Sequence, residues 1–183
     1  MYGIVNQSIQ GLIRKEFGEE TWLKIIAKSK LEISDFENHE VYDDKYTYLL
    51  AGAAAEILCT SLEAVLKLFG EFWILDISLK KYPSLMGAGG NSFREFMKNL
   101  PNFHNRIYLS YPKLIPPEFK VSEKDDAILV EYYSNRPGLT PMMEGMLVGL
   151  TKMFNEHNAV VVLLEEKINT GKEFDLFMIT WEQ

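Results

Sequence analysis

The hydrophobic pattern of this chain changes its period near Pro112, and that change constrains the fold more than any other feature. Before Pro112, apolar residues recur at the three- and four-residue spacing of amphipathic helices. After it, Pro116 and Pro117 exclude a long helix from their segment, and apolar runs become short and rich in valine, isoleucine and aromatic residues. The sequence therefore predicts an α+β fold, with helices first and an antiparallel sheet after them.

The predicted helices before Pro112 are separated by glycines and polar stretches. The first covers residues 4–17, where apolar side chains share one face, and Gly18 can end it. Further helices are expected at residues 21–30, at 46–58, from Thr60 or Ser61 to Leu75, and from Asn91 or Ser92 to His104. An acidic loop at 35–44 and a glycine-rich run at 87–90 interrupt the series.

The predicted sheet has strands at residues 127–133, 160–164 and 174–181. A helix with Pro141 near its start, continuing to Phe154, is expected between the first two of these strands and packed on the sheet. Residues 169–172 have the composition of a hairpin turn, so they are expected to join the last two strands.

A length of 183 residues suits one domain with its own hydrophobic core, so residues 1–183 are expected to form a single domain. The net charge of -7 argues against nucleic-acid binding, which depends on cationic contacts to phosphate. The sequence contains no apolar run long enough to cross a membrane, and its first residues lack a basic segment followed by an apolar core, so no signal peptide is expected. A single cysteine, Cys59, excludes an internal disulfide. These features predict a cytoplasmic protein with no membrane partner.

Of the three histidines, His104 is the candidate metal ligand. It follows Leu100 and Phe103 on an apolar helix face, where a single neutral imidazole is suited to coordinate haem iron. A core histidine satisfied by a backbone carbonyl is the alternative for the same position. His39 lies in the acidic loop and is expected to be solvated, and His157 is expected to cap a helix end.

The run Tyr132-Tyr133-Ser134-Asn135-Arg136 is the candidate for binding carboxylates. Read as an extended strand, it places Tyr132, Ser134 and Arg136 on one face, because successive strand side chains alternate between faces. Two hydroxyls and a guanidinium fork match one or two carboxylates, such as the propionates of haem. A polar strand end followed by a turn explains the same residues without a ligand.

Together these motifs resemble the haem nitric oxide/oxygen binding (H-NOX) domains, which are related to the haem domain of soluble guanylate cyclase. The resemblance covers essentially the whole chain. Its motifs are Met1-Tyr2-Gly3-Ile4-Val5, Gly70-Glu71-Phe72-Trp73, Asn99-Leu100-Pro101-Asn102-Phe103-His104, Pro116-Pro117, Glu131-Tyr132-Tyr133-Ser134-Asn135-Arg136 and Gly138-Leu139. The resemblance implies an H-NOX fold with haem b held between the helical part and the sheet. No Cys-x-x-Cys-His motif exists for covalent attachment.

For individual residues, the resemblance implies that His104 is the proximal iron ligand and that Tyr132, Ser134 and Arg136 hold the propionates. Pro117 matches the family proline that presses on the porphyrin and distorts it from planarity. Binding of nitric oxide is then expected to weaken or break the iron bond to His104. Release of the helix that bears His104 would shift the two halves of the domain, as in a two-state switch.

The distal residues bear on which gas binds. Oxygen-binding family members carry a tyrosine at the position of Pro141, and proline can donate no hydrogen bond. Iron-bound oxygen depends on a distal donor more than nitric oxide and carbon monoxide do. Trp73 and Met143 are expected near the distal side, and ordinary helical core is the alternative for both.

The resulting expectation is a bacterial gas sensor, not an enzyme, that binds nitric oxide and carbon monoxide and excludes oxygen. The resemblance implies a separate partner, a sensor histidine kinase or a diguanylate cyclase. An oxygen sensor is the nearest alternative, because the indole N–H of Trp73 can supply a donor from another direction. A haem carrier and a haem enzyme such as a peroxidase are further alternatives.

Overall fold

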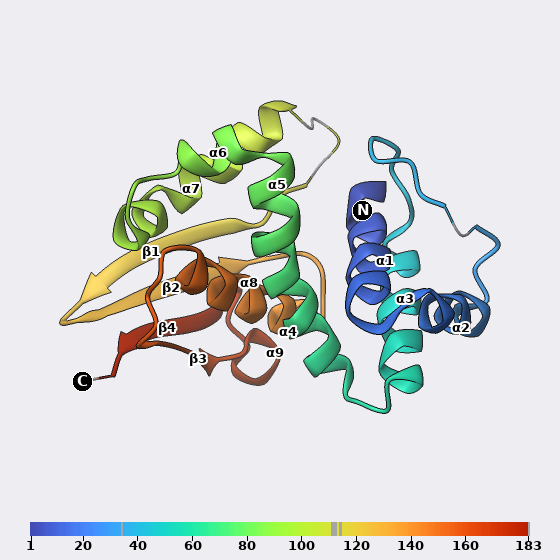
Figure 1. The fold of residues 1–183 in the computed structure, drawn as a ribbon. Coiled ribbons are helices and arrows are strands. Elements are labelled where there is room, and N and C mark those ends of the chain that lie inside the picture. The colour runs from blue at the N-terminus through green and yellow to red at the C-terminus, as the bar shows by residue number, and fades with distance from the viewer. Residues whose placement is uncertain (34, 111–112, 114, 183) are drawn as a thin grey trace. The chain divides into compact units, whose positions relative to one another are not determined.

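The computed structural model describes residues 1–33, 35–110, 113 and 115–182, and the chain packs as two compact units, Met1–Phe69 and Gly70–Gln183 (Figure 1). Pro112, at which the hydrophobic period changes, lies outside the described residues. Helices precede it and the sheet strands follow it, so the predicted α+β fold is confirmed.

The first unit is built from helices. They are α1 (Gly3–Phe17), α2 (Glu19–Ser29), α3 (Asp44–Ile57) and most of α4 (Leu62–Phe72). Gly18 ends α1 as predicted, with a φ of 86° that favours glycine. Asp43 caps α3, because its side chain accepts the backbone N–H of Lys45 at 2.9 Å. The alanine-rich face of α3 is buried where α3 packs against α1 and α2.

A helical stretch from Leu62 to Lys81 leads into the second unit and changes its winding on the way. It consists of α4, the π-helical segment η1 (Trp73–Ser78) and α5 (Leu79–Lys81). Of the two predicted caps, Ser61 accepts the backbone N–H of Ala64 at 3.0 Å. The π-helical segment was not predicted, because residue spacing alone does not distinguish it from a regular helix.

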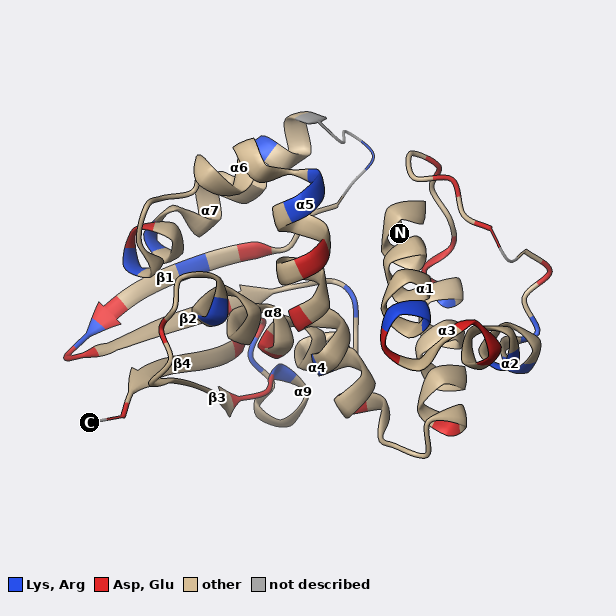
Figure 2. Cartoon of the chain, in the orientation of Figure 1, with Lys and Arg blue, Asp and Glu red and all other residues tan. Residues whose placement is uncertain are grey.

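The sheet of the second unit is antiparallel and has the strand order β1-β2-β4-β3. The strands are β1 (Glu118–Lys124), β2 (Ala127–Tyr133), β3 (Ala159–Glu165) and β4 (Asp175–Trp181). The last three confirm the predicted strands, whereas β1 was missed. It is an edge strand that buries only Phe119 and carries charges along its length (Figure 2), so its alternation of apolar and polar residues is weak.

The remaining helices are α6 (Pro83–Gly87), α7 (Phe93–Ser110), α8 (Thr140–Met153) and α9 (Lys167–Thr170). Pro141 lies in the first turn of α8, as predicted. The hairpin turn predicted at 169–172 is wrong in detail, because α9 occupies most of this connection and Gly171 ends it with a φ of 72°. His157 is exposed and lies beyond Met153, the last residue of α8, so it does not end that helix, and a capping role for it stays a prediction.

The core of the second unit lies between the helices and one face of the sheet. Helix α7 packs against β1 and α8 against β3. From the sheet, the core takes Ile128, Val130, Phe177 and Ile179, none of them more than 1% exposed. Within the described part of the chain, no single helix is long and apolar enough to cross a membrane, although α3 and the stretch from Leu62 to Lys81 meet the criterion when taken together.

Candidate functional site

Helix α7 carries His104, and one face of α7 is buried along much of its length. Ser92 starts the helix by accepting the backbone N–H of Glu95 at 3.3 Å. The buried face consists of Phe93, Phe96, Met97, Leu100 and Phe103. Pro101 lies inside the helix and has no N–H to donate to the carbonyl of Met97. His104 therefore follows directly after a weakened turn of an otherwise well-packed helix.

The backbone of α7 holds the imidazole of His104 in one tautomer. Its Nδ1 lies 3.1 Å from the carbonyl oxygen of Leu100, and it is the donor because a carbonyl oxygen can only accept. Burial lowers the pKa of His104 to about 4, although the hydrogen bond to Leu100 acts in the opposite direction. The ring is thus neutral at physiological pH. Its Nε2 carries a lone pair and has no hydrogen-bond partner among the residues that the structure describes.

Phe119 connects His104 to the first residue of the predicted carboxylate-binding run. The ring centroids of Phe119 and His104 lie 4.6 Å apart, and those of Phe119 and Tyr132 lie 5.5 Å apart. The pairing of β1 with β2 places Phe119 directly opposite Tyr132. Tyr132 is buried. Phe119 therefore joins Tyr132 of the sheet and His104 of α7 in one aromatic cluster. Sequence reasoning missed Phe119 because it missed β1.

The run from Tyr132 to Arg136 does not continue as a strand. Strand β2 ends at Tyr133, and the Ser134 hydroxyl oxygen accepts the backbone N–H of Arg136 at 3.1 Å in the turn that follows. The prediction that three side chains share one strand face is therefore wrong for Ser134 and Arg136. The serine side chain bonds the local backbone, and Gly138 with a φ of 75° continues the turn.

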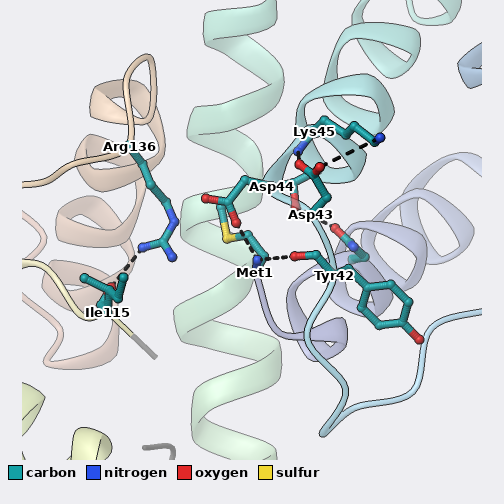
Figure 3. Close-up of polar contacts among 9 residues, drawn as sticks. Met1, Tyr42, Asp43, Asp44, Lys45, Ile115 and Arg136 are labelled. Carbon is teal, nitrogen blue, oxygen red and sulfur yellow. Dashed lines mark hydrogen bonds and ion pairs between the residues drawn. The ribbon is translucent and has the colours of Figure 1, made fainter. Parts of the chain in front are cut away.

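Arg136 lies against the segment that precedes β1. One of its Nη atoms donates to the carbonyl oxygen of Ile115 at 2.9 Å (Figure 3). Half-buried Pro117 belongs to the same segment, immediately before Glu118, which pairs with Tyr133. The predicted propionate-binding residues and Pro117 therefore gather at one end of the β1–β2 pair, where β1 begins and β2 ends.

A second cation reaches this turn. The Nζ atom of Lys167, at the start of α9, donates to the backbone carbonyl of Ser134. No local pattern in the sequence indicates this contact, because the two residues are 33 positions apart. Arg136 and Lys167 together give the turn a cationic character that suits carboxylate ligands.

Trp73 and Met143 belong to the hydrophobic core of the second unit. Met143 is 5% exposed on α8, and Trp73 packs against the same cluster from the first residue of η1. The aromatic contacts that join His104 to Tyr132 include neither of them. The distal role of Trp73 and Met143 therefore stays a prediction.

The residues of this site fit a haem. A porphyrin-bound iron requires an axial ligand, which the neutral Nε2 of His104 can supply. The propionates require hydrogen-bond donors and cations; Ser134 and Arg136 lie in one turn, and Lys167 contacts this turn from the start of α9.

Comparison with known proteins also indicates a haem-binding domain. Residues 2–162 match the haem-NO-binding (HNOB) family. Soluble guanylate cyclase gcy-33 of Caenorhabditis elegans is 29% identical over 183 residues, which are 100% of this chain and 19% of that protein. Guanylate cyclase soluble subunit beta-2 of Rattus norvegicus is 34% identical over 116 residues, covering 61% of this chain and 17% of that subunit. The chain thus spans about a fifth of the length of these relatives.

Solved structures share the fold. The H-NOX protein from S. oneidensis in the Fe(II)NO ligation state superposes with a TM-score of 0.84 at 17% identity, covering 100% of both chains. The Fe(II) unliganded H-NOX protein from K. algicida gives a TM-score of 0.80 at 23% identity, covering 100% of this chain and 97% of that one. The fold is therefore that of H-NOX proteins, and the family match across most of the sequence shows that this chain belongs to the haem-NO-binding family.

Proposed function

We propose that this chain is a sensor domain that binds haem b non-covalently, with Nε2 of His104 as the iron ligand. The proposal rests on the hydrogen bond and the lowered pKa of the His104 ring. Nδ1 donates to the Leu100 carbonyl at 3.1 Å, and burial lowers the pKa of His104 to about 4. A histidine ligand whose second nitrogen donates to a carbonyl is oriented and made more basic, as in many metal sites. Nε2 therefore needs no deprotonation before it binds iron at neutral pH.

The propionates are proposed to bind at the turn that follows β2. The Tyr132 and Ser134 hydroxyls and the Arg136 guanidinium are the donors. The contact of Arg136 with the Ile115 carbonyl ties the guanidinium to the segment that contains Pro117, which is proposed to press on the porphyrin. Because Arg136 has five N–H donors, the bond to Ile115 is compatible with a further carboxylate contact.

Gas selection is proposed to favour nitric oxide and carbon monoxide over oxygen. Ferrous haem supplies the iron on which such gases bind. Pro141 offers no hydrogen-bond donor from the first turn of α8, and Met143 is an apolar neighbour on the same helix. An oxygen sensor is the second candidate, because the half-buried Trp73 has an indole donor. A stable oxygen complex of the reduced protein would favour that second candidate.

Output is proposed to pass to a separate cytoplasmic partner, a sensor histidine kinase or a diguanylate cyclase, through movement of the part of α7 that bears His104. The position of His104 just beyond Pro101 supports this, because the missing backbone hydrogen bond weakens the helix at that turn. The domain itself is proposed to sense and not to catalyse.

Replacement of His104 by glycine tests the iron ligand, with His157→Gly as a control at an exposed histidine. The absorption spectrum of the reduced protein is recorded without gas and then under oxygen, carbon monoxide and nitric oxide. We expect His104→Gly to lose its haem spectrum and to regain it with added imidazole, while His157→Gly matches the parent. An unchanged spectrum in His104→Gly would overturn the ligand assignment, and a parent protein that takes up no haem would overturn the proposed function.

A further inference from the structure

A buried carboxylate that the site described above does not use lies at the start of β4. Asp175 is 0% exposed. One of its oxygens accepts the hydroxyl of Thr140 at 2.7 Å, and the other accepts the backbone N–H of Lys167 at 2.7 Å. Burying a carboxylate is costly unless its oxygens are hydrogen-bonded. In this case both oxygens have donors, each from a different segment of the chain.

Both donors belong to segments that adjoin the turn with the predicted propionate-binding residues. Thr140 is the first residue of α8, which begins shortly after Arg136. Lys167 is the first residue of α9, and its Nζ donates to the carbonyl of Ser134. Asp175 also stands opposite Tyr132 in the pairing of β2 with β4. The carboxylate therefore links the residues on both sides of the turn.

We propose that Asp175, Thr140 and Lys167 form a positioning cluster that holds the run from Tyr132 to Arg136 in the conformation that receives the haem propionates. This inference rests on the proposed binding of haem by the same run. Asp175 positions and does not bind, since its negative charge repels a propionate and both of its oxygens are already engaged. Lys167 connects the carboxylate to the turn, because its backbone bonds Asp175 and its side chain bonds Ser134.

The physical reason for such a cluster is preorganisation. The turn contains exposed Asn135, Pro137 and Gly138, so its own packing restrains it little. If the Ser134 carbonyl were not held, the turn would be ordered only when haem binds, and the entropy lost then would weaken binding. Fixing the turn in advance therefore slows the loss of haem without a new contact to it.

Two substitutions separate the cluster from the rest of the fold. Lys167→Met removes the bond to Ser134 and keeps the backbone N–H that Asp175 accepts. Thr140→Val removes the bond to Asp175 at similar side-chain volume, and Thr140→Ser restores a hydroxyl. Thr151→Val is the matched control, because Thr151 is also buried on α8 and its hydroxyl donates to the carbonyl of Val148 at 2.8 Å.

The first measurement is the rate at which the haem-loaded protein transfers haem to an excess of apomyoglobin. We expect Lys167→Met and Thr140→Val to lose haem about tenfold faster than the parent, roughly the factor for one charge-assisted hydrogen bond. Thr140→Ser should return most of the parent rate, and Thr151→Val should differ from it by less than about twofold.

The second measurement separates positioning from general loss of stability. Amide hydrogen exchange at Arg136, whose N–H donates to Ser134, should accelerate in Lys167→Met but not in Thr151→Val, in the full chain with or without haem. In an Arg136→Ala background, Lys167→Met should accelerate haem loss less than it does alone, because both changes act on one turn.

The outcomes distinguish this inference from the proposed function. If Arg136→Ala accelerates haem loss while Lys167→Met behaves like Thr151→Val, the cluster inference fails and haem binding stands. Full additivity of Lys167→Met and Arg136→Ala would also overturn the inference. If the parent takes up no haem, the proposed function fails. Unchanged amide hydrogen exchange at Arg136 in Lys167→Met would separately overturn the inference about the cluster.

Discussion

The two halves of α7 differ in how firmly the rest of the second unit holds them. In the N-terminal half, Phe93 is 0% exposed and contacts the rings of Phe154 and Trp181, with centroids 6.2 and 6.1 Å away. Arg94 stacks over the ring of Trp181 at 4.5 Å. Beyond Pro101, in the C-terminal half, Leu109 is 82% exposed.

Ion pairs extend the same contrast. Arg94 and Lys98 pair with Glu123 of β1 at 3.2 and 3.0 Å, and both anchor the N-terminal half. In the other half, buried Phe103 and the ring of His104 contact the core, and Arg106 donates to the carbonyl oxygen of Ala88 at 3.2 Å. We infer that the N-terminal half is held more firmly, and that Pro101 separates it from the segment that bears His104, which is proposed to move. A device with one fixed and one releasable end is a simple form of two-state switch.

Removal of the main aromatic anchor should have the largest effect. Phe93→Ala should lower the free energy of unfolding by about 3–5 kcal/mol, because it removes a fully buried ring and leaves a cavity in the core. Leu109→Ala, in the exposed half, should change it by less than about 0.5 kcal/mol. Urea unfolding of the two variants measures the difference, and similar losses would contradict the contrast between the halves.

The lowered pKa of His104 should make the haem-free protein less stable in acid. Unfolded His104 takes up a proton near its ordinary pKa of about 6.5, whereas the folded form does so only near 4. Between these values the unfolded state binds more protons, so stability falls as the pH falls. The loss should approach about 3 kcal/mol at the lower end of that range.

Urea unfolding at several pH values tests this prediction in the haem-free protein. His104→Gln should reduce the slope of stability against pH between about pH 6.5 and pH 4, because glutamine does not titrate. His39 and His157 remain in both proteins and serve as an internal control. An equal slope in both proteins would show that the ring of His104 is not buried in the folded state.

Restoring the missing backbone hydrogen bond at Pro101 should reduce the difference in stability between the two halves of α7. Pro101→Ala should raise the free energy of unfolding by about 1–2 kcal/mol, because the regained helix bond exceeds the advantage that proline gives by restricting the unfolded chain. It should also slow amide exchange near His104. Pro83→Ala is the control, since Pro83 lies in the first turn of α6, where proline costs little. Equal gains in the free energy of unfolding from both changes would show that Pro101 does not specifically weaken α7.

The surface tether of α7 should have the smallest effect. Arg94→Ala should cost about 0.5–1 kcal/mol, because it removes the stacking on Trp181 and a partly exposed ion pair with Glu123. Arg94→Lys should recover part of this, since lysine keeps the charge but not the planar guanidinium. Thermal unfolding at low and high salt separates the two contributions, and a salt-independent loss would assign the tether to stacking alone.

The accuracy of the sequence-based predictions depended on how local the determining interactions are. Helices α1, α3 and α8 were predicted because an apolar or alanine-rich face, and in α1 and α8 a terminal glycine or proline, are visible within a few residues. Strand β1 was missed because an edge strand with charges at most positions lacks a clear alternation. The extended reading of Ser134 and Arg136 failed because a serine hydroxyl can replace the strand partner of a backbone N–H.

The sequence by itself determined the candidate ligands: a histidine on an apolar helix face, and a hydroxyl- and arginine-bearing run ahead of a proline–glycine turn. Only the tertiary structure decided that Phe119 joins His104 to Tyr132, and that Asp175 and Lys167 hold the turn at Ser134. Periodicity reports on residues within a turn of helix or a few strand positions. Strand register, the burial of a carboxylate and the depressed pKa of an imidazole instead arise from packing between segments that are distant in the sequence.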